Sequence, residues 1–69
     1  MMNNFAQNLK TLRLLNGLSQ PALAKALQVS NGMISFWENG IYEPTASNII
    51  KIASYFKISI DELLLSEII

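Results

Sequence analysis

The chain has 69 residues, of which five are Lys or Arg, five are Asp or Glu and none is His or Cys, and 51% of its positions are hydrophobic. A chain of this length forms one domain around one small core, which leaves no second lobe to enclose a substrate. The lack of Cys and His removes disulfides, thiol and imidazole catalysis, and the usual metal ligands. We therefore expect no enzyme, no metal and no cofactor, and the zero net charge argues against a general binder of polyanions.

Apolar residues are more abundant than one small core can hide, which predicts a partner or self-association. They form no membrane span, because the longest pure apolar run, Leu63-Leu64-Leu65, is far shorter than the roughly 20 residues that cross a bilayer. The first residues also lack the basic and apolar regions of a targeting signal. The sequence thus predicts a cytoplasmic protein with no membrane partner, and nothing in it indicates a small-molecule substrate.

The apolar positions recur with a helical period and show no sustained alternation, so the expected fold is all-α. A first helix is expected from about residue 4 to residue 16, followed by Gly17, which can take the left-handed conformation that ends a helix. A second helix begins after the N-cap Ser19, with Gln20 and Pro21 in its first turn, and runs to Leu27.

Three further N-caps start the later helices: Ser30, Thr45 and Ser59, the last in a capping box with Glu62. The third helix is expected to end at Asn39-Gly40 and the fourth near Lys57. Every connection is short, which favours one compact five-helix bundle.

The second and third helices are joined by a turn of very few residues, which is the geometry of a helix-turn-helix. The order and spacing of the residues around this turn are similar to those of the Cro/CI-type, or lambda-repressor-like, helix-turn-helix family. The residues that carry the resemblance are Gly17-Leu18-Ser19-Gln20, Leu23-Ala24, Val29-Ser30, Ile34, Glu38-Asn39-Gly40, Pro44 and Ile58-Ser59-Ile60-Asp61-Glu62-Leu63-Leu64. The similarity covers residues 9–64, most of the chain.

The resemblance implies that residues 1–69 form a single helix-turn-helix DNA-binding domain. It implies a sequence-specific transcriptional regulator of phage or bacterial type, a repressor, which binds double-stranded DNA through the major groove. Ala24 would lie where the two helices cross, and Val29, Ile34 and Trp37 would face inward and fix the angle between them. A protein-interaction module that kept the fold without binding DNA is the alternative.

By the same resemblance, the outward side of the third helix reads bases, and its candidate residues are Asn31, Gly32, Met33, Ser35 and Phe36. Asn31 would pair with adenine, and Met33 or Phe36 would pack on thymine methyl groups, which favours a site containing A·T pairs. The alternative for Met33 and Phe36 is that they are half-buried packing residues.

Neutral groups are expected to contact the DNA phosphates. The start of the second helix, with Ser19 and Gln20, offers N–H groups and the positive end of a helix dipole. Asn39, the Gly40 amide and the cap Thr45 would form a second clamp on the same strand. Such donors position a protein without net charge, so the salt dependence of DNA binding should be shallow.

Charged residues and two turn positions also follow the resemblance. It implies a partly buried ion pair between Arg13 and Glu38, whose alternative is two unrelated surface charges. Residues 1–57 carry a net charge of +3 (five bases minus two acids) and residues 58–69 carry −3. Gln28 and Lys57 stand where the family often has a glycine in the left-handed region, so either each carries a strain of roughly 1 kcal/mol or the two turns differ slightly from those of the family.

One helix-turn-helix reads only a few base pairs, so a twofold homodimer is expected to supply affinity. The apolar surplus at residues 65–69 is the predicted dimerisation tail, with Leu65, Ile68 and Ile69 in the interface. Leu14 and Leu15 form a second surplus on the first helix. The alternatives for the tail are that it folds back onto the bundle or leads into another domain.

Overall fold

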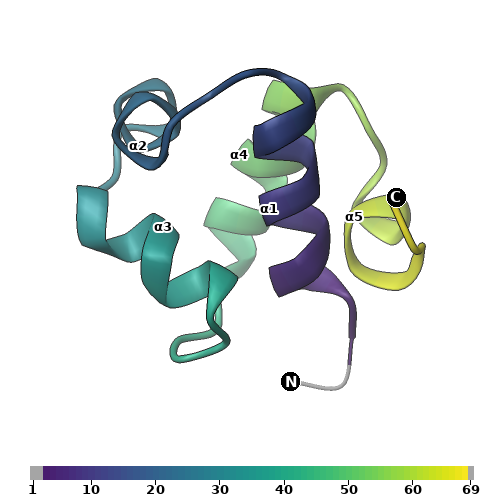
Figure 1. The fold of residues 1–69 in the computed structure, drawn as a ribbon. Coiled ribbons are helices and arrows are strands. Elements are labelled where there is room, and N and C mark those ends of the chain that lie inside the picture. The colour runs from purple at the N-terminus through teal and green to yellow at the C-terminus, as the bar shows by residue number, and fades with distance from the viewer. Residues whose placement is uncertain (1–2, 69) are drawn as a thin grey trace.

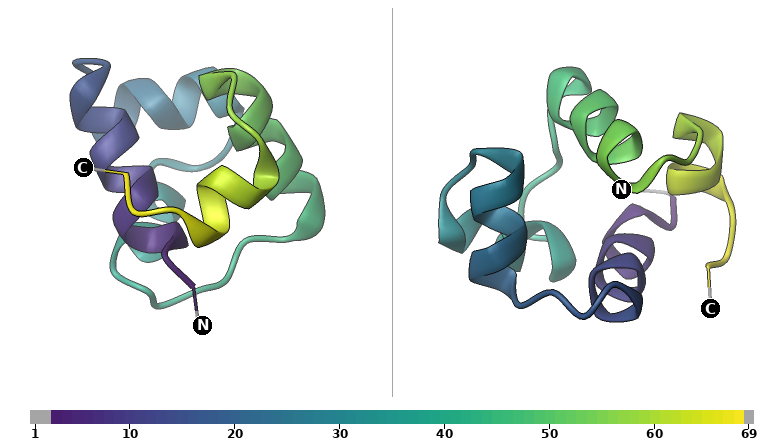
Figure 2. Two further views of the ribbon diagram at one scale, coloured as in Figure 1. Left: turned by 90° about the vertical axis from the view of Figure 1, so that its right-hand side faces the viewer. Right: turned by 90° about the horizontal axis from the view of Figure 1, so that it is seen from above.

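The structure is a computed structural model that describes residues 3–68. Within these residues it contains five helices and no strand: α1 (Phe5–Leu15), α2 (Gln20–Leu27), α3 (Asn31–Glu38), α4 (Ala46–Phe56) and α5 (Ile60–Leu65). α1 lies at the centre, with α2 and α3 on one side, α5 on the other and α4 behind it (Figure 1), and the view from above agrees (Figure 2). The predicted all-α bundle is confirmed, with helix ends close to the expected positions.

Each helix contributes one side to the core. The buried apolar residues are Phe5, Leu9, Leu12, Leu23, Ala24, Leu27, Ile34, Trp37, Ile52, Ala53 and Leu63. Trp37 is the largest of them, and its ring meets that of Phe5 edge to face at a centroid distance of 6.3 Å. The inward positions predicted for Ile34 and Trp37 are confirmed, and Val29 packs against the core while staying half-buried.

Side-chain caps start three of the four capped helices as predicted. The Ser19 hydroxyl accepts from the Ala22 N–H at 3.1 Å, and the Thr45 hydroxyl accepts from the Asn48 N–H at 3.2 Å. The capping box at α5 is complete, since its two reciprocal hydrogen bonds both measure 3.0 Å. Ser30 occupies the N-cap position of α3, but its side chain makes no cap hydrogen bond.

Four helices end in the same motif, in which one left-handed residue lets two successive N–H groups reach back to the last turn. At the end of α1, Gly17 has φ 67° and donates to the Leu14 carbonyl, while Leu18 donates to the Arg13 carbonyl, both at 3.0 Å. Gly40 has φ 70° at the corresponding place after α3. After α2 and α4 the left-handed residues are Gln28 (φ 59°) and Lys57 (φ 58°), so the predicted left-handed positions are confirmed.

Replacing Gln28 or Lys57 by glycine is expected to raise the free energy of unfolding. A side chain in the left-handed region costs about 1–2 kcal/mol, and the greater freedom of glycine in the unfolded chain takes back part of the relief, which leaves about 0.5–1 kcal/mol per site. Thermal unfolding followed by circular dichroism should show a Tm higher by about 2–8 °C for a domain of this size.

The matched controls are Gly17→Ala and Gly40→Ala, which place a side chain in the same backbone conformation and should lower Tm. A Tm that does not rise in either glycine variant would mean that Gln28 and Lys57 are not strained.

Two asparagines of α1 hold the segment that follows α5. The buried Asn8 side chain donates to the carbonyls of Leu63 at 2.8 Å and Ser66 at 2.7 Å, and its oxygen accepts from the Ile68 N–H at 3.1 Å. The Asn4 side chain donates to the Ser66 carbonyl at 3.1 Å. The tail therefore runs back along α1 (Figure 2), and neither asparagine was singled out by the sequence pattern for this role.

The residues of the predicted dimerisation tail differ in how far they are buried. Ile68 packs against the core of its own domain, which matches the alternative in which the tail folds back onto the bundle. Leu65 points outward and is 69% exposed. Ile69 lies outside the described residues.

Candidate nucleic-acid interface

α2 and α3 meet across a turn whose geometry the sequence sets locally. The left-handed Gln28 lets the Val29 N–H return to the Ala24 carbonyl at 3.0 Å, and Ser30 then begins the next helix. Ala24 is 3% exposed, so its small side chain lets the two helices approach closely, as predicted. Ile34 and Trp37 anchor the inner face of α3 in the core, and this fixes which face of α3 points outward.

The outward side of α3 carries most of the predicted base-reading residues. Asn31 and Gly32 are exposed, Ser35 is half-buried, and Phe36 is 38% exposed. Met33 is half-buried and packs against the core, so its surroundings match the alternative of a packing residue. The outward surface of α3 is therefore formed by Asn31, Gly32, Ser35 and Phe36.

Gly32 has no structural reason to be glycine. A Cβ built at this position would meet only the Phe36 Cε2 at 3.9 Å, which is an ordinary van der Waals contact. In a helix, glycine costs about 0.5–1 kcal/mol of stability relative to alanine. The bare backbone at Gly32 is thus a feature that the packing of this domain does not require.

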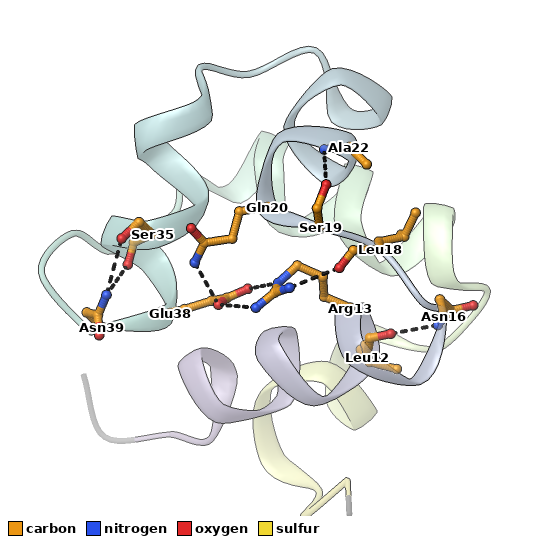
Figure 3. A network of polar contacts seen from close by, with 10 residues as sticks. All are labelled: Leu12, Arg13, Asn16, Leu18, Ser19, Gln20, Ala22, Ser35, Glu38 and Asn39. Atoms are coloured by element: carbon orange, nitrogen blue, oxygen red, sulfur yellow. Dashed lines mark hydrogen bonds and ion pairs between the residues drawn. The ribbon is translucent and has the colours of Figure 1, made fainter.

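Arg13 and Glu38 form the ion pair that the resemblance implies, and it joins α1 to the end of α3 (Figure 3). Arg13 Nε donates to Glu38 Oε2 at 2.7 Å and its Nη2 donates to Oε1 at 3.1 Å, while Nη1 donates to the Leu18 carbonyl at 2.9 Å. The two side chains are 10% and 3% exposed. The hydrogen bonds that Arg13 donates to the Glu38 carboxylate raise the pKa of Arg13, so the guanidinium keeps its charge despite burial.

Gln20 extends this pair to α2, which the sequence pattern did not reveal. Its Nε2 donates to Glu38 Oε1 at 3.2 Å, so Glu38 accepts from both Arg13 and Gln20 (Figure 3). An amide nitrogen carries two hydrogens, and this bond uses one of them. The first residue of α2 is therefore held by the same carboxylate that holds α1 against α3.

The donors predicted for a phosphate clamp after α3, on Asn39 and Gly40, make hydrogen bonds within the chain. The Asn39 side-chain amide donates to the carbonyl and the hydroxyl of Ser35, at 2.8 and 3.3 Å, and the Asn39 N–H donates to the same carbonyl. The Gly40 N–H donates to the Trp37 carbonyl at 3.2 Å. These donors close the end of α3, and Thr45 caps the exposed start of α4.

Tyr42 and Lys51 make contacts that sequence reasoning missed. The Tyr42 ring, in the loop after α3, meets the Phe36 ring edge to face at a centroid distance of 5.0 Å. Lys51 Nζ donates to the Leu27 carbonyl at 3.0 Å and so joins α4 to the last turn of α2. The sequence shows only that an aromatic residue follows Gly40. Whether Tyr42 meets Phe36 depends on how the loop turns, which the sequence pattern does not reveal.

Within residues 3–68, no helix is long and apolar enough to cross a bilayer. The same part of the chain contains no group of three or more His, Cys, Asp or Glu residues that could hold a metal ion. The arrangement instead offers an exposed helix face on a rigid support, which suits recognition of a groove.

Residues 9–63 match the helix-turn-helix family. The chain is 40% identical over 63 residues to the HTH-type transcriptional activator BcrR of Enterococcus faecalis, a match that covers 91% of this chain and 31% of that protein. It is 39% identical over 59 residues to an uncharacterized HTH-type transcriptional regulator of Methanocaldococcus jannaschii, covering 86% of this chain and 89% of that protein.

A crystal structure of a transcriptional regulator from Listeria innocua aligns with all of this chain and 66% of that chain, with a TM-score of 0.86 and 31% sequence identity. The chain thus spans about a third of the Enterococcus activator and about two thirds of the Listeria regulator. It spans most of the Methanocaldococcus protein.

Proposed function

Because the chain belongs to the Cro/CI-type helix-turn-helix family of DNA-binding transcriptional regulators, we propose that it represses transcription by reading double-stranded DNA in a sequence-specific manner. It acts as a homodimer on a pseudo-palindromic operator in the cytoplasm, and residues 1–69 serve as one DNA-binding domain. The observation that carries the proposal is the outward face of α3, where Asn31, Gly32 and Phe36 are exposed while the inner face of the helix packs in the core.

Base reading is assigned to the residues of that face: Asn31, Gly32, Ser35 and Phe36. Asn31 offers both an amide donor and a carbonyl acceptor, which match the N7 and N6 groups of adenine. Gly32 lets the helix backbone approach the base edges closely, since no side chain stands between them. This use explains a glycine that the fold itself does not need.

Exchange of Asn31 for alanine is expected to weaken binding to a selected DNA site by about 1–3 kcal/mol and to leave nonspecific binding unchanged. Sites are selected by the wild-type chain from a pool of random duplexes, and Kd is measured at one fixed salt concentration. Gln7→Ala is the control, because Gln7 is exposed on α1. Equal losses on selected and unselected DNA would remove Asn31 from the base-reading set, and the absence of any DNA binding would refute the proposed function.

Phosphate contacts are assigned to the starts of α2 and α4. Ser19 accepts a hydrogen bond from Ala22, which leaves its own hydroxyl hydrogen for an outside acceptor. Gln20 has one amide hydrogen left beyond its bond to Glu38. Thr45 has a free hydroxyl hydrogen in the same way as Ser19. These contacts use neutral donors, which supports the expectation of a shallow salt dependence.

Self-association is assigned to the exposed end of α5, with Leu65 as the central residue. Leu65→Ser is expected to shift the wild-type dimer to monomer in sedimentation equilibrium, because Leu65 is 69% exposed and its loss does not disturb the core. Truncation after residue 64 is a poor test, since it removes Ser66 and Ile68, which hold Asn8. Leu15→Ser, at 67% exposure on α1, is the matched control. A dimer that only Leu15→Ser dissociates would move the interface to α1.

Activation is the second candidate for the regulatory effect, because the Enterococcus relative is named as an activator. A reporter gene placed behind a selected site separates the two. Lower expression in cells that make the protein supports repression, and higher expression replaces it with activation.

A protein-interaction module on the same fold is the remaining candidate. It is favoured by exposed apolar side chains on several elements, among them Leu14, Ile41 and Ile50, each 58% exposed. Selection from the pool of random duplexes tests this candidate as well, because a protein-interaction module that does not bind DNA would enrich no DNA sequence.

A further inference from the structure

The most unusual part of the α3 surface is an exposed aromatic pair next to a glycine. Phe36 is 38% exposed and Tyr42 is 55% exposed, and their rings meet at an interplanar angle of 80°. Gly32 lies one helical turn before Phe36 on the same face of α3. A Cβ at Gly32 would stand 3.9 Å from the Phe36 ring, so this ring lies against the bare turn.

The turn after α3 brings Tyr42 to this position. Gly40 takes φ 70°, and the Ile41 N–H then returns to the Phe36 carbonyl at 2.9 Å. The loop therefore folds back over the end of α3, and the next residue is Tyr42. The Phe36 ring is thus held between the Gly32 turn and the Tyr42 ring, which restricts the rotamers that an exposed aromatic side chain would otherwise sample.

A phenyl ring has no hydrogen-bond donor or acceptor, and the major groove presents one apolar group on its base edges, the C5-methyl group of thymine. A ring that is already held in place loses little entropy when it makes such a contact. Resting on the proposed DNA-binding function, we propose that Tyr42 is a positioning residue that fixes Phe36 over Gly32, and that Phe36 so held reads a thymine methyl group in the operator.

The test removes the methyl group from the DNA and the rings from the protein. Duplexes are selected from a random pool by the wild-type chain, and each thymine of the selected site is replaced in turn by uracil, which differs from thymine only by the methyl group. For the wild type, at least one replacement per half-site should weaken binding about four-fold, the effect of losing a buried methyl-sized group worth about 0.8 kcal/mol. Phe36→Ala should bind the thymine and uracil duplexes equally at that position.

Tyr42→Ala should lose most of this discrimination although Phe36 is still present, and Tyr42→Phe should keep it because the ring contact survives. Tyr55→Ala is the matched control, since Tyr55 is 42% exposed on α4 and its ring meets Phe56 edge to face at 5.0 Å. Circular dichroism and Tm verify that each variant is folded, which the exposure of all three altered side chains favours.

Several results would overturn the inference. The first is that the wild type tolerates uracil at every position. The second is that discrimination between thymine and uracil persists in Phe36→Ala or is fully kept in Tyr42→Ala. The third is that Tyr42→Phe or Tyr55→Ala loses as much of this discrimination as Tyr42→Ala. A chain that selects no duplex overturns both this inference and the proposed function. A chain that selects duplexes but ignores the methyl group overturns this inference alone.

Discussion

Replacing Glu38 by glutamine is expected to lower the free energy of unfolding by about 3–5 kcal/mol, because it leaves the buried Arg13 guanidinium without its counter-charge. Glutamine has the same size as glutamate, so the loss of stability comes from the missing charge and the altered hydrogen bonds. A domain of this size has a total stability of only about 3–10 kcal/mol. Urea unfolding of the variant should therefore show a much lower midpoint, or a chain that is partly unfolded without urea.

The double variant Arg13→Leu/Glu38→Leu separates the cost of a stranded charge from the net worth of the pair. Replacing both partners by apolar residues is often nearly neutral, so we expect the double variant to be more stable than either single one. The upward shift of the Arg13 pKa also determines how its contribution to stability depends on pH. Stability from a raised pKa is lost only as pH rises through that pKa, so the contribution of Arg13 should stay constant from neutral to mildly alkaline pH. Losses that simply add in the double variant would mean that the two charges act independently.

The parts of the fold that depend on near neighbours in the chain could be predicted. Ser19, Thr45 and the pair Ser59 and Glu62 cap helices through bonds that span three residues, so the sequence contains both partners at a fixed spacing. Helix ends follow from the same local geometry. Gln28 marks the limit of such local prediction. Its left-handed conformation was predicted only from the family resemblance, because no local propensity of glutamine favours it.

The contacts that could not be predicted join elements distant in the chain. Gln20 and Glu38 are 18 residues apart and meet only after α2 and α3 have packed. Lys51 reaches the Leu27 carbonyl across 24 residues, and its sequence context is that of any exposed lysine. The hydrogen bonds of Asn39 could not be predicted either, since the sequence shows its amide but not that Ser35 accepts from it.

The candidate interface therefore has two levels with different physical demands. The residues proposed to touch bases, such as Asn31 and Gly32, are exposed and can be changed without cost to the core. Beneath them, Arg13, Gln20 and Glu38 fix how α1, α2 and α3 meet, and their loss should damage stability and DNA binding together. Variants of the first kind test recognition, and variants of the second kind test the support on which recognition depends.

Replacing Asn8 by aspartate is expected to lower the free energy of unfolding at neutral pH by roughly 3 kcal/mol, the cost of a buried charge without a counter-charge. The Asn8 side chain is fully buried, and its amide donates to the carbonyls of Leu63 and Ser66. A carboxylate has the same shape but can only accept, so it would face two carbonyl oxygens with like partial charge. The expected result is a tail released from α1 and a weakened contact between α1 and α5.

The pH dependence of this variant distinguishes the mechanism from a loss of shape. Burial among carbonyls raises the pKa of the new carboxyl in the folded state above its unfolded value of about 3.9. A raised folded pKa favours the folded state at low pH and loses that contribution as pH rises, so the variant should lie closest to the wild type near pH 4 and furthest from it near pH 7. Gln7→Glu makes the same chemical change on the neighbouring exposed position, and its stability should stay close to that of the wild type. An aspartate variant whose deficit is the same at both pH values would show that Asn8 does not hold the tail through its amide donor.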